Sequence, residues 1–169
     1  MKAKFYLPAL VLVFISVYSF AQETKGGLTW YTDIQKADKI SKESGKPIFA
    51  FFTGSDWCGW CHKLQADVFA KQPFIDWAKK NVVLLELDFP RKKQLPQELA
   101  QQNQSLQQAL GIRGYPTVWL MYVNQDKAAN NINLATLGSL GYPSGAVPGK
   151  EEVKFLEQAN EILKKKPNN

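Results

Sequence analysis

The sequence is poor in cysteine and histidine. Its two cysteines, Cys58 and Cys61, and its single histidine, His62, all lie in one stretch, SDWCGWCHKL, at residues 55–64. A small disulfide-stapled domain has many more cysteines, and a pair three positions apart closes too short a loop to stabilise a fold usefully. A structural zinc site takes four ligands, more than this stretch supplies, so we expect no metal. Chemistry at the two sulfur atoms is the better explanation.

Clusters of one charge are also lacking. The 169 residues carry a formal net charge of +6, yet the longest basic runs, at 91–93 and 164–166, have only three residues each. Short runs of this kind are typical of solvated ends of elements, so we expect no nucleic-acid binding. A hydrophobic content of 45% suits one globular domain with its own core, and we expect a monomer.

Long apolar runs are absent except at the N-terminus. Lys2 and Lys4 precede an apolar segment, 5–20, and Ser19 and Ala21 provide small residues before Gln22. This pattern predicts a signal peptide at 1–21 that is cleaved near Ala21, with an uncleaved anchor as the alternative. We therefore expect an exported protein, periplasmic or secreted, in a compartment where disulfides persist.

After residue 22, the sequence predicts a flexible lead-in at 22–27, a domain at 28–166 and a tail at 167–169. Apolar runs predict strands, the first of them at a sheet edge, and the spacing of apolar residues predicts helices between and after them. The strands are expected at 28–31, 47–54, 81–89, 117–123 and 132–138, with a loop at 124–131. This order indicates an α/β protein with a central mixed sheet and helices on both faces.

Several helix boundaries can be predicted in more detail. Thr32 and Gln35 fit a capping box for a helix that Gly45 ends, and Pro73 can open another helix. A helix at 95–110 is expected to place three leucines against the core: Leu99, Leu106 and Leu110. The last helix is expected to bury one face, made by Val153, Leu156, Ala159 and Leu163.

Cys58 follows a predicted buried strand and opens a predicted helix, with Cys61 one turn further along. The free N–H groups and the positive dipole end of a helix N-terminus stabilise a thiolate, so we expect Cys58 to be the more acidic thiol and the attacking one. Cys61 is expected to face the core and to resolve the mixed disulfide that Cys58 forms. No cofactor beyond this Cys58–Cys61 pair is expected.

Three other interpretations remain open for the stretch. Cys-x-x-Cys-His is also a haem-attachment motif with His62 as axial ligand, but Met121, the remaining candidate for a second ligand after signal removal, lies in a strand pattern. Two thiolates can bind Cu(I). A non-catalytic binding module is the third alternative.

A second feature, IRGYPT at 112–117, places Pro116 directly before a predicted central strand. A proline at the entrance of such a strand is accommodated by a cis Tyr115–Pro116 bond in a tight turn. Gly114 beside it lets a partner approach the backbone closely.

The combination of GKPI, an aromatic strand, WCGWC and GYPT resembles the thioredoxin family, and more narrowly its secreted bacterial members, from about Leu28 to Leu163. The resemblance implies a thioredoxin-like fold and a thiol–disulfide oxidoreductase that acts on protein thiols and disulfides, with electrons from a membrane-bound partner. It implies that Cys58 is the nucleophile, Cys61 the resolving thiol and Pro116 a cis-proline. It also implies substrate contacts by residues around them: Trp57, Gly59, Trp60 and Tyr115.

The sequence departs from that family at two points. Phe52 stands where many members have a buried aspartate that assists proton transfer, and Glu86 is either a substitute or an ordinary sheet-edge carboxylate. Gly59-Trp60 replaces the usual Gly-Pro, so Trp60 either forms a docking surface or simply packs. These changes leave the direction of electron flow open, with a slight preference for reduction.

Overall fold

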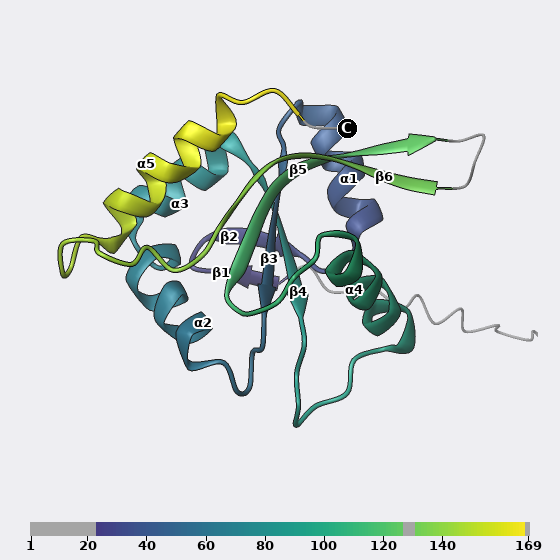
Figure 1. Cartoon of the computed structure of the whole chain (residues 1–169), viewed down its shortest axis with the longest axis horizontal. Coiled ribbons are helices and arrows are strands. Elements are labelled where there is room, and N and C mark those ends of the chain that lie inside the picture. Colours follow the sequence, from purple (N-terminus) through teal and green to yellow (C-terminus); the bar gives the residue numbers. More distant parts are fainter. Residues whose placement is uncertain (1–22, 127–130, 168–169) are drawn as a thin grey trace, which may run out of the picture.

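A computed structural model describes residues 23–126 and 131–167, so the predicted signal peptide and the end of the predicted tail lie outside the described residues. Six strands form one sheet in the order β1-β2-β4-β3-β5-β6 (Figure 1). β3 runs parallel to β4 and antiparallel to β5, which confirms the mixed sheet. The strands are β1 (Glu23–Lys25), β2 (Leu28–Tyr31), β3 (Ile48–Thr53), β4 (Val83–Asp88), β5 (Thr117–Asp126) and β6 (Asn131–Leu140).

Two predictions at the sheet margins were wrong. Part of the expected flexible lead-in, 22–27, forms β1, which pairs with β2 and moves the edge of the sheet outward. Gly26 and Gly27 both have positive φ angles, 57° and 74°, and this geometry closes the tight hairpin between the two strands. The expected loop at 124–131 is shorter than predicted, because β5 continues to Asp126 and β6 begins at Asn131.

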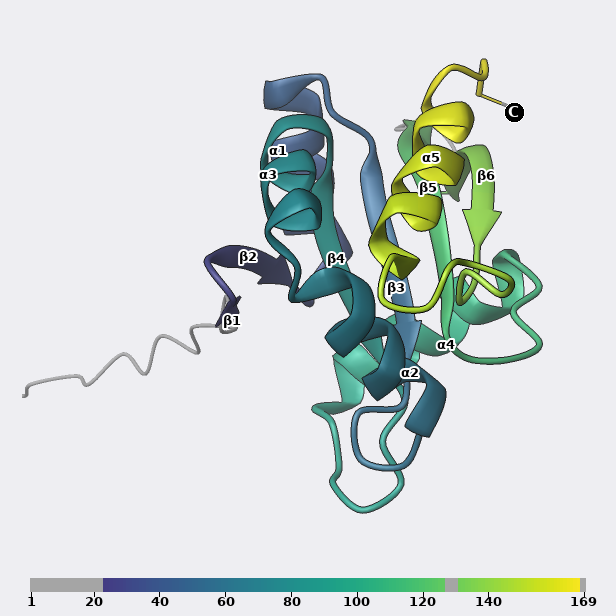
Figure 2. The ribbon, with the colours of Figure 1, turned by 90° about the vertical axis from the view of Figure 1, so that its left-hand side faces the viewer.

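Helices cover both faces of the sheet, as predicted (Figure 2). One face is covered by α2, α3, α5 and a π-helical turn η1, and the opposite face by α1 and α4. The helical elements are α1 (Ile34–Ser44), α2 (Gly59–Leu64), η1 (Gln65–Phe69), α3 (Gln72–Asn81), α4 (Gln97–Ala109) and α5 (Glu151–Leu163). None of the helices within the described ranges has the length and apolar character needed to cross a membrane.

The start of α1 differs from the predicted capping box. Asp33, not Thr32, is the N-cap, and its Oδ1 atom accepts a hydrogen bond from the Gln35 backbone N–H at 2.8 Å. The Ile34 N–H donates to the side-chain oxygen of Gln102 on α4, at 2.8 Å. The carboxylate of Asp33 directly precedes the helix, and aspartate is a better acceptor for the first free N–H groups than threonine. Gly45 ends the helix in the left-handed conformation, as expected.

The predicted face of α5 is confirmed for Leu156, Ala159 and Leu163, which are buried or partly buried against the core, but not for Val153. Phe155, Ala159 and Ile162 are buried, whereas Val153 is 45% exposed. Gly138 on β6 explains the burial of Ile162, because a Cβ atom there would lie 3.2 Å from the Ile162 side chain. The missing side chain lets this part of α5 pack closely on the sheet.

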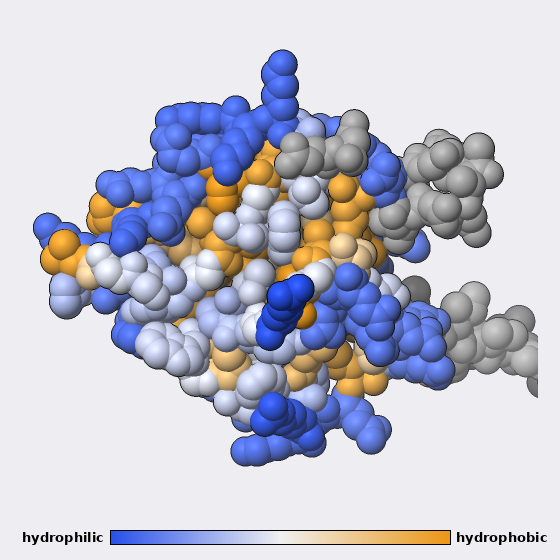
Figure 3. Space-filling model, viewed as in Figure 1, coloured by the Kyte–Doolittle hydropathy of each residue, from blue (hydrophilic) through white to orange (hydrophobic). Residues whose placement is uncertain are grey.

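In α4, Leu106 is buried while Leu99 and Leu110 are only partly buried. Figure 3 shows that the face seen in Figure 1 is strongly hydrophilic over α4 and at the lower end, where the β4–α4 connection lies. The glutamine-rich face of α4 therefore meets solvent, as a solvated helix face does.

An aromatic cluster fills the core between β3 and the helices that follow it. Phe49 packs against Phe69, Phe74 and Phe155, with ring centroids 5.6, 5.7 and 6.2 Å apart. Full burial of each such ring contributes about 1.5–3 kcal/mol to folding. This cluster lies beneath α2 and η1, so it supports the helix that begins at the cysteines.

Candidate active site around Cys58 and Cys61

Cys58 and Cys61 form a disulfide, with their Cα atoms 5.2 Å apart. Cys58 is the N-cap residue of α2, and its Sγ atom accepts a hydrogen bond from the Cys61 backbone N–H at 3.2 Å. Cys58 is 5% exposed and Cys61 is fully buried. The structure therefore places Cys58 at the opening of the helix and Cys61 inside it, facing the core, as the sequence predicts.

The loop before α2 depends on Gly54, which follows the end of β3. Its carbonyl oxygen accepts the N–H groups of Trp57 and Cys58, at 3.2 and 2.9 Å. A Cβ atom at Gly54 would lie 2.4 Å from the Trp57 indole, closer than real contacts allow. Glycine is needed here because the Trp57 ring lies directly over the backbone.

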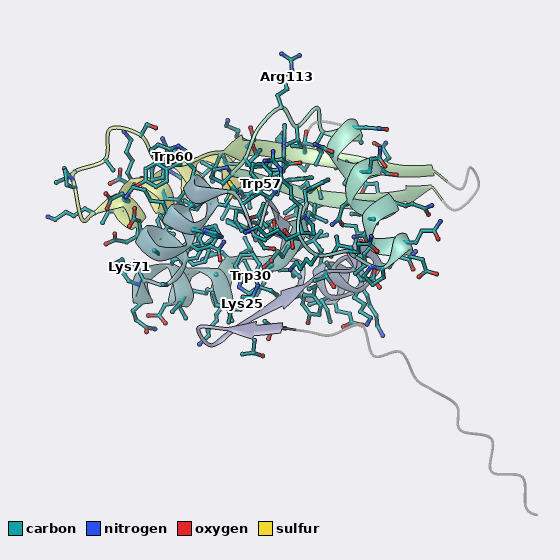
Figure 4. All side chains as sticks on the ribbon, turned by 90° about the horizontal axis from the view of Figure 1, so that it is seen from below. Lys25, Trp30, Trp57, Trp60, Lys71 and Arg113 are labelled. Carbon is teal, nitrogen blue, oxygen red and sulfur yellow. A yellow bond between two sulfur atoms is a disulfide. The ribbon has the colours of Figure 1, made fainter. Side chains whose placement is uncertain are left out.

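Trp57, which Figure 4 labels, joins the loop of the cysteines to two segments that are distant in the sequence. Its Nε1–H donates to the Phe89 carbonyl oxygen at 2.7 Å, and its ring lies edge-on to Tyr115 at 5.7 Å. The guanidinium carbon of Arg91 lies 3.8 Å from the ring centre, within cation–π distance. The predicted position of Trp57 beside the cysteines is thus held by contacts from the β4–α4 connection and the 115–116 turn.

The Tyr115–Pro116 peptide bond is cis. The Tyr115 ring packs against Phe89 at 5.3 Å, and its hydroxyl accepts a hydrogen bond from the Gln107 side-chain NH₂ at 2.8 Å. Burial raises the pKa of the Tyr115 hydroxyl. Thr117 pairs with Phe52 near the end of β3, so this turn lies at the end of the sheet from which the chain leads to Cys58.

Asp56 is a residue of this site that the sequence reasoning missed. Its carboxylate accepts the backbone N–H groups of three successive residues: Arg91 at 2.9 Å, Lys92 at 2.7 Å and Lys93 at 3.3 Å. These hydrogen bonds, the one from Arg91 foremost, lower the pKa of Asp56. The loop of the cysteines therefore holds the loop that follows β4.

A second missed carboxylate, Asp88, ties the same loops together. It accepts the Ser55 backbone N–H and hydroxyl, at 2.8 and 2.6 Å, and pairs with Lys93 at 3.0 Å. The buried Asn103 side chain donates to the Asp88 carbonyl oxygen at 2.9 Å. The sequence did offer a signal for Asp88, since this residue ends a strand that runs parallel to β3. Parallel neighbours end at the same edge of a sheet, so Asp88 could be expected near the loop that follows β3.

Gly59 and Trp60 face outward at the start of α2. Nothing lies within 4 Å of a Cβ atom built on Gly59, and Trp60 is 60% exposed. The Trp60 ring contacts Tyr142 at 5.1 Å, and the Tyr142 hydroxyl donates to Asp67 at 2.7 Å. Hydrogen bonds from Lys63 and then Tyr142 lower the pKa of Asp67. The Trp60 ring thus packs against Tyr142 on one side, while most of its surface is exposed to solvent.

Glu86 forms an ion pair with Lys25 of β1 at 3.0 Å, and its side chain is 14% exposed. It lines a small cavity of about 140 Å³ together with Gln65 and Phe69. Phe52 is fully buried in the core on the α1 and α4 side of the sheet. A part for Glu86 in proton transfer stays a prediction.

His62, the residue that suggested haem, is exposed on α2. Its Nε2 atom lies 2.8 Å from the Ser55 carbonyl oxygen. Among the residues that the structure describes, no group of three or more histidine, cysteine, aspartate or glutamate side chains is arranged to hold a metal ion.

Comparisons with known proteins agree with this geometry. A family model described as a thioredoxin-like domain matches residues 34–131. The chain is 42% identical over 76 residues to the disulfide bond reductase DsbH of Chlamydia pneumoniae, covering 45% of this chain and 46% of that protein. It is 26% identical over 130 residues to the thioredoxin-related protein DsbJ of the same organism, covering 77% of this chain and 36% of that protein. The chain thus spans less than half the length of these two relatives.

Solved structures show the same likeness. A structure described as DsbH oxidoreductase matches with a TM-score of 0.66 and 30% identity, over 81% of this chain and 85% of that chain. A thioredoxin from Thermus thermophilus matches with a TM-score of 0.54 and 16% identity, over 80% of this chain and 86% of that chain, which supports the fold alone. With the sequence match, the mixed sheet and the cysteine pair at the start of α2, these findings show that the chain belongs to the thioredoxin-like family.

Proposed function

We propose that the chain is an exported thiol–disulfide oxidoreductase that exchanges disulfides with protein substrates through Cys58 and Cys61. The observation that carries the proposal is the Cys58–Cys61 disulfide at the N-terminus of α2, with Cys58 the less buried of the two residues. The names of two relatives, a disulfide bond reductase and a thioredoxin-related protein, support the same chemistry.

In the reductive direction, the Cys58 thiolate attacks one sulfur of a substrate disulfide. A mixed disulfide forms, and the other substrate sulfur leaves as a thiolate that takes up a proton. The Cys61 thiolate then attacks Cys58, the Cys58–Cys61 disulfide forms, and the second substrate thiol is released. Two electrons pass from the protein to the substrate. The N–H of Cys61 supports the first step, because it already donates to the Cys58 sulfur.

Substrate binding is assigned to the groups around the sulfurs. The backbone of Tyr115 and Pro116 offers hydrogen bonds to an extended segment, as in strand addition. Trp57, Gly59 and Trp60 provide the surface beside it, and the 60% exposure of Trp60 favours a docking role over simple packing.

Reduction is the favoured direction, and the word "reductase" in the name of one relative supports it. An exported reductase needs electrons from the other side of the membrane, so a membrane-bound dithiol partner belongs to the proposal. Export itself is based on Lys2, Lys4 and the apolar segment 5–20.

Reduction of insulin disulfides by dithiothreitol tests the activity. Wild-type protein is expected to accelerate the appearance of turbidity, and the Cys58→Ser variant is expected to show the uncatalysed rate. Equal rates for the two proteins would contradict the proposal and would favour a non-catalytic binding module. A redox titration of the pair against glutathione then tests the direction, because a reductase needs a potential well below that of its substrates.

A further inference from the structure

A cationic loop lies beside the cysteines, and the proposed chemistry does not use it. Arg91, Lys92 and Lys93 follow β4 and are all exposed. Asp56 fixes the backbone of this loop, because its carboxylate accepts the N–H groups of all three residues. Asp56 lies two residues before Cys58, so the backbone of these three residues is tied to the loop that leads to the reactive sulfur.

Each of the three side chains has a different environment. The Arg91 guanidinium lies over the Trp57 ring at 3.8 Å, and Lys93 pairs with Asp88 at 3.0 Å. Lys92 is bonded only through its backbone N–H, to Asp56, and its side chain makes no hydrogen bond or ion pair with any residue in the described parts of the chain. Arg91 and Lys92 therefore present positive charge to solvent beside Trp57.

Two carboxylates next to the loop, those of Asp56 and Asp88, already accept hydrogen bonds within the protein. Asp56 is bonded to backbone N–H groups, and Asp88 is 8% exposed and bonded to Ser55 and Lys93. Arg113, just before the 115–116 turn, adds a further exposed cation and projects away from the body of the protein (Figure 4). Asp88 is buried and paired, and the Asp56 carboxylate is bonded to three backbone N–H groups, whereas the cations are exposed, so a negatively charged segment would be attracted to this surface.

A hollow of about 520 Å³ adjoins the loop and gives the segment room. Phe89, Pro90 and Leu95 supply apolar lining, and the polar lining includes Lys93 together with Asp88, the carboxylate that it pairs with. Phe89 also contacts Tyr115, so one wall of the hollow packs against the turn where an extended substrate is proposed to bind.

We propose that the loop 91–93 is a specificity element that favours protein substrates with acidic residues next to the reactive disulfide. This inference rests on the proposed function and adds a substrate class to it. An ion pair between exposed groups is individually weak. Two acidic residues in the substrate are therefore expected to raise its rate of reduction about three- to ten-fold at low salt. The advantage should disappear near 1 M salt, where the screening length is about 3 Å.

The test uses three synthetic peptides with one internal disulfide, identical except for two neighbouring residues, which are glutamate, serine or lysine. The readout is the second-order rate constant of reduction by fully reduced protein. Wild type is expected to reduce the glutamate peptide fastest and the lysine peptide slowest. Lys92→Gln, which removes no side-chain contact with the described residues, should lose part of this preference, and Arg91→Gln/Lys92→Gln should lose nearly all of it.

A matched control removes the same charge elsewhere. Lys80, in the last turn of α3, and Lys165, just after α5, are exposed, and Lys80→Gln/Lys165→Gln should keep the preference. Equal rates with the three peptides, or a preference that survives in Arg91→Gln/Lys92→Gln, would overturn the inference alone. Failure of wild type to reduce any of the peptides would overturn the proposed function as well.

Discussion

The backbone N–H of Cys61 points at the sulfur atom of Cys58, 3.2 Å away, and Cys58 itself caps α2. This arrangement is expected to give the two thiols different acidities in the reduced protein. A hydrogen bond and a helix N-terminus favour the charged form of Cys58, whereas burial disfavours the charged form of Cys61.

In the reduced protein, the pKa of Cys58 is therefore expected to lie below the usual value of about 8.5, and that of Cys61 above it. Thiolate absorbance measured against pH, in Cys61→Ser and Cys58→Ser variants, separates the two groups. A lower pKa for Cys61 than for Cys58 would show that the attacking and resolving roles are assigned the wrong way round.

Gly54 gives a prediction for stability. Gly54→Ala places a methyl group 2.4 Å from the Trp57 indole, so the ring or the loop must move. Overpacking of this kind costs about 1–3 kcal/mol, and displacement of Trp57 should also slow insulin reduction. Urea denaturation measures the first effect. Gly59→Ala is the matched control, because the space around Gly59 is open. Similar stabilities for the two variants would contradict the close packing of Trp57.

Asp56 predicts a pH dependence of stability. Its pKa is lowered in the folded protein, mainly by the Arg91 N–H, so the folded state binds its proton less readily than the unfolded chain does. The resulting stabilisation is present above the unfolded pKa of about 3.9 and is lost as the pH falls through the folded pKa. Asp56→Asn should accordingly destabilise the protein at neutral pH and much less in strong acid.

Denaturation curves of wild type and Asp56→Asn at several pH values check this. The exposed Glu157→Gln substitution on α5 removes a carboxylate elsewhere and serves as the control. A stability difference between wild type and Asp56→Asn that stays constant from neutral to acid pH would show that the Asp56 charge does not hold the 91–93 loop.

Much of the fold could be predicted from local sequence patterns. The apolar runs of β3 and β4 and the positions of Gly45 and Pro73 carry their own signals, and the strand-to-helix change at Cys58 follows from them. The hairpin of β1 was missed because three polar residues carry no apolar pattern, and their pairing depends on the Gly26-Gly27 turn.

The polar network of the candidate site was harder to predict. Asp56 and Asp88 are distant from their partners in the sequence, and the hydrogen bonds to the 91–93 loop depend on how two connections meet at the end of the sheet. The burial of Ile162 on α5 was missed because it depends on Gly138, which lies on another element. Sequence periodicity gives the presence of a helix more reliably than the packing of each residue on it.

Trapping of mixed disulfides tests the central claim most directly. Without Cys61 the second step is blocked, so the Cys61→Ser variant is expected to accumulate covalent adducts with protein substrates when expressed in an exporting bacterial host. These adducts should be visible on non-reducing gels and should disappear with reductant and in the Cys58→Ser/Cys61→Ser variant. Absence of such adducts, or their persistence when Cys58 is replaced, would contradict the account.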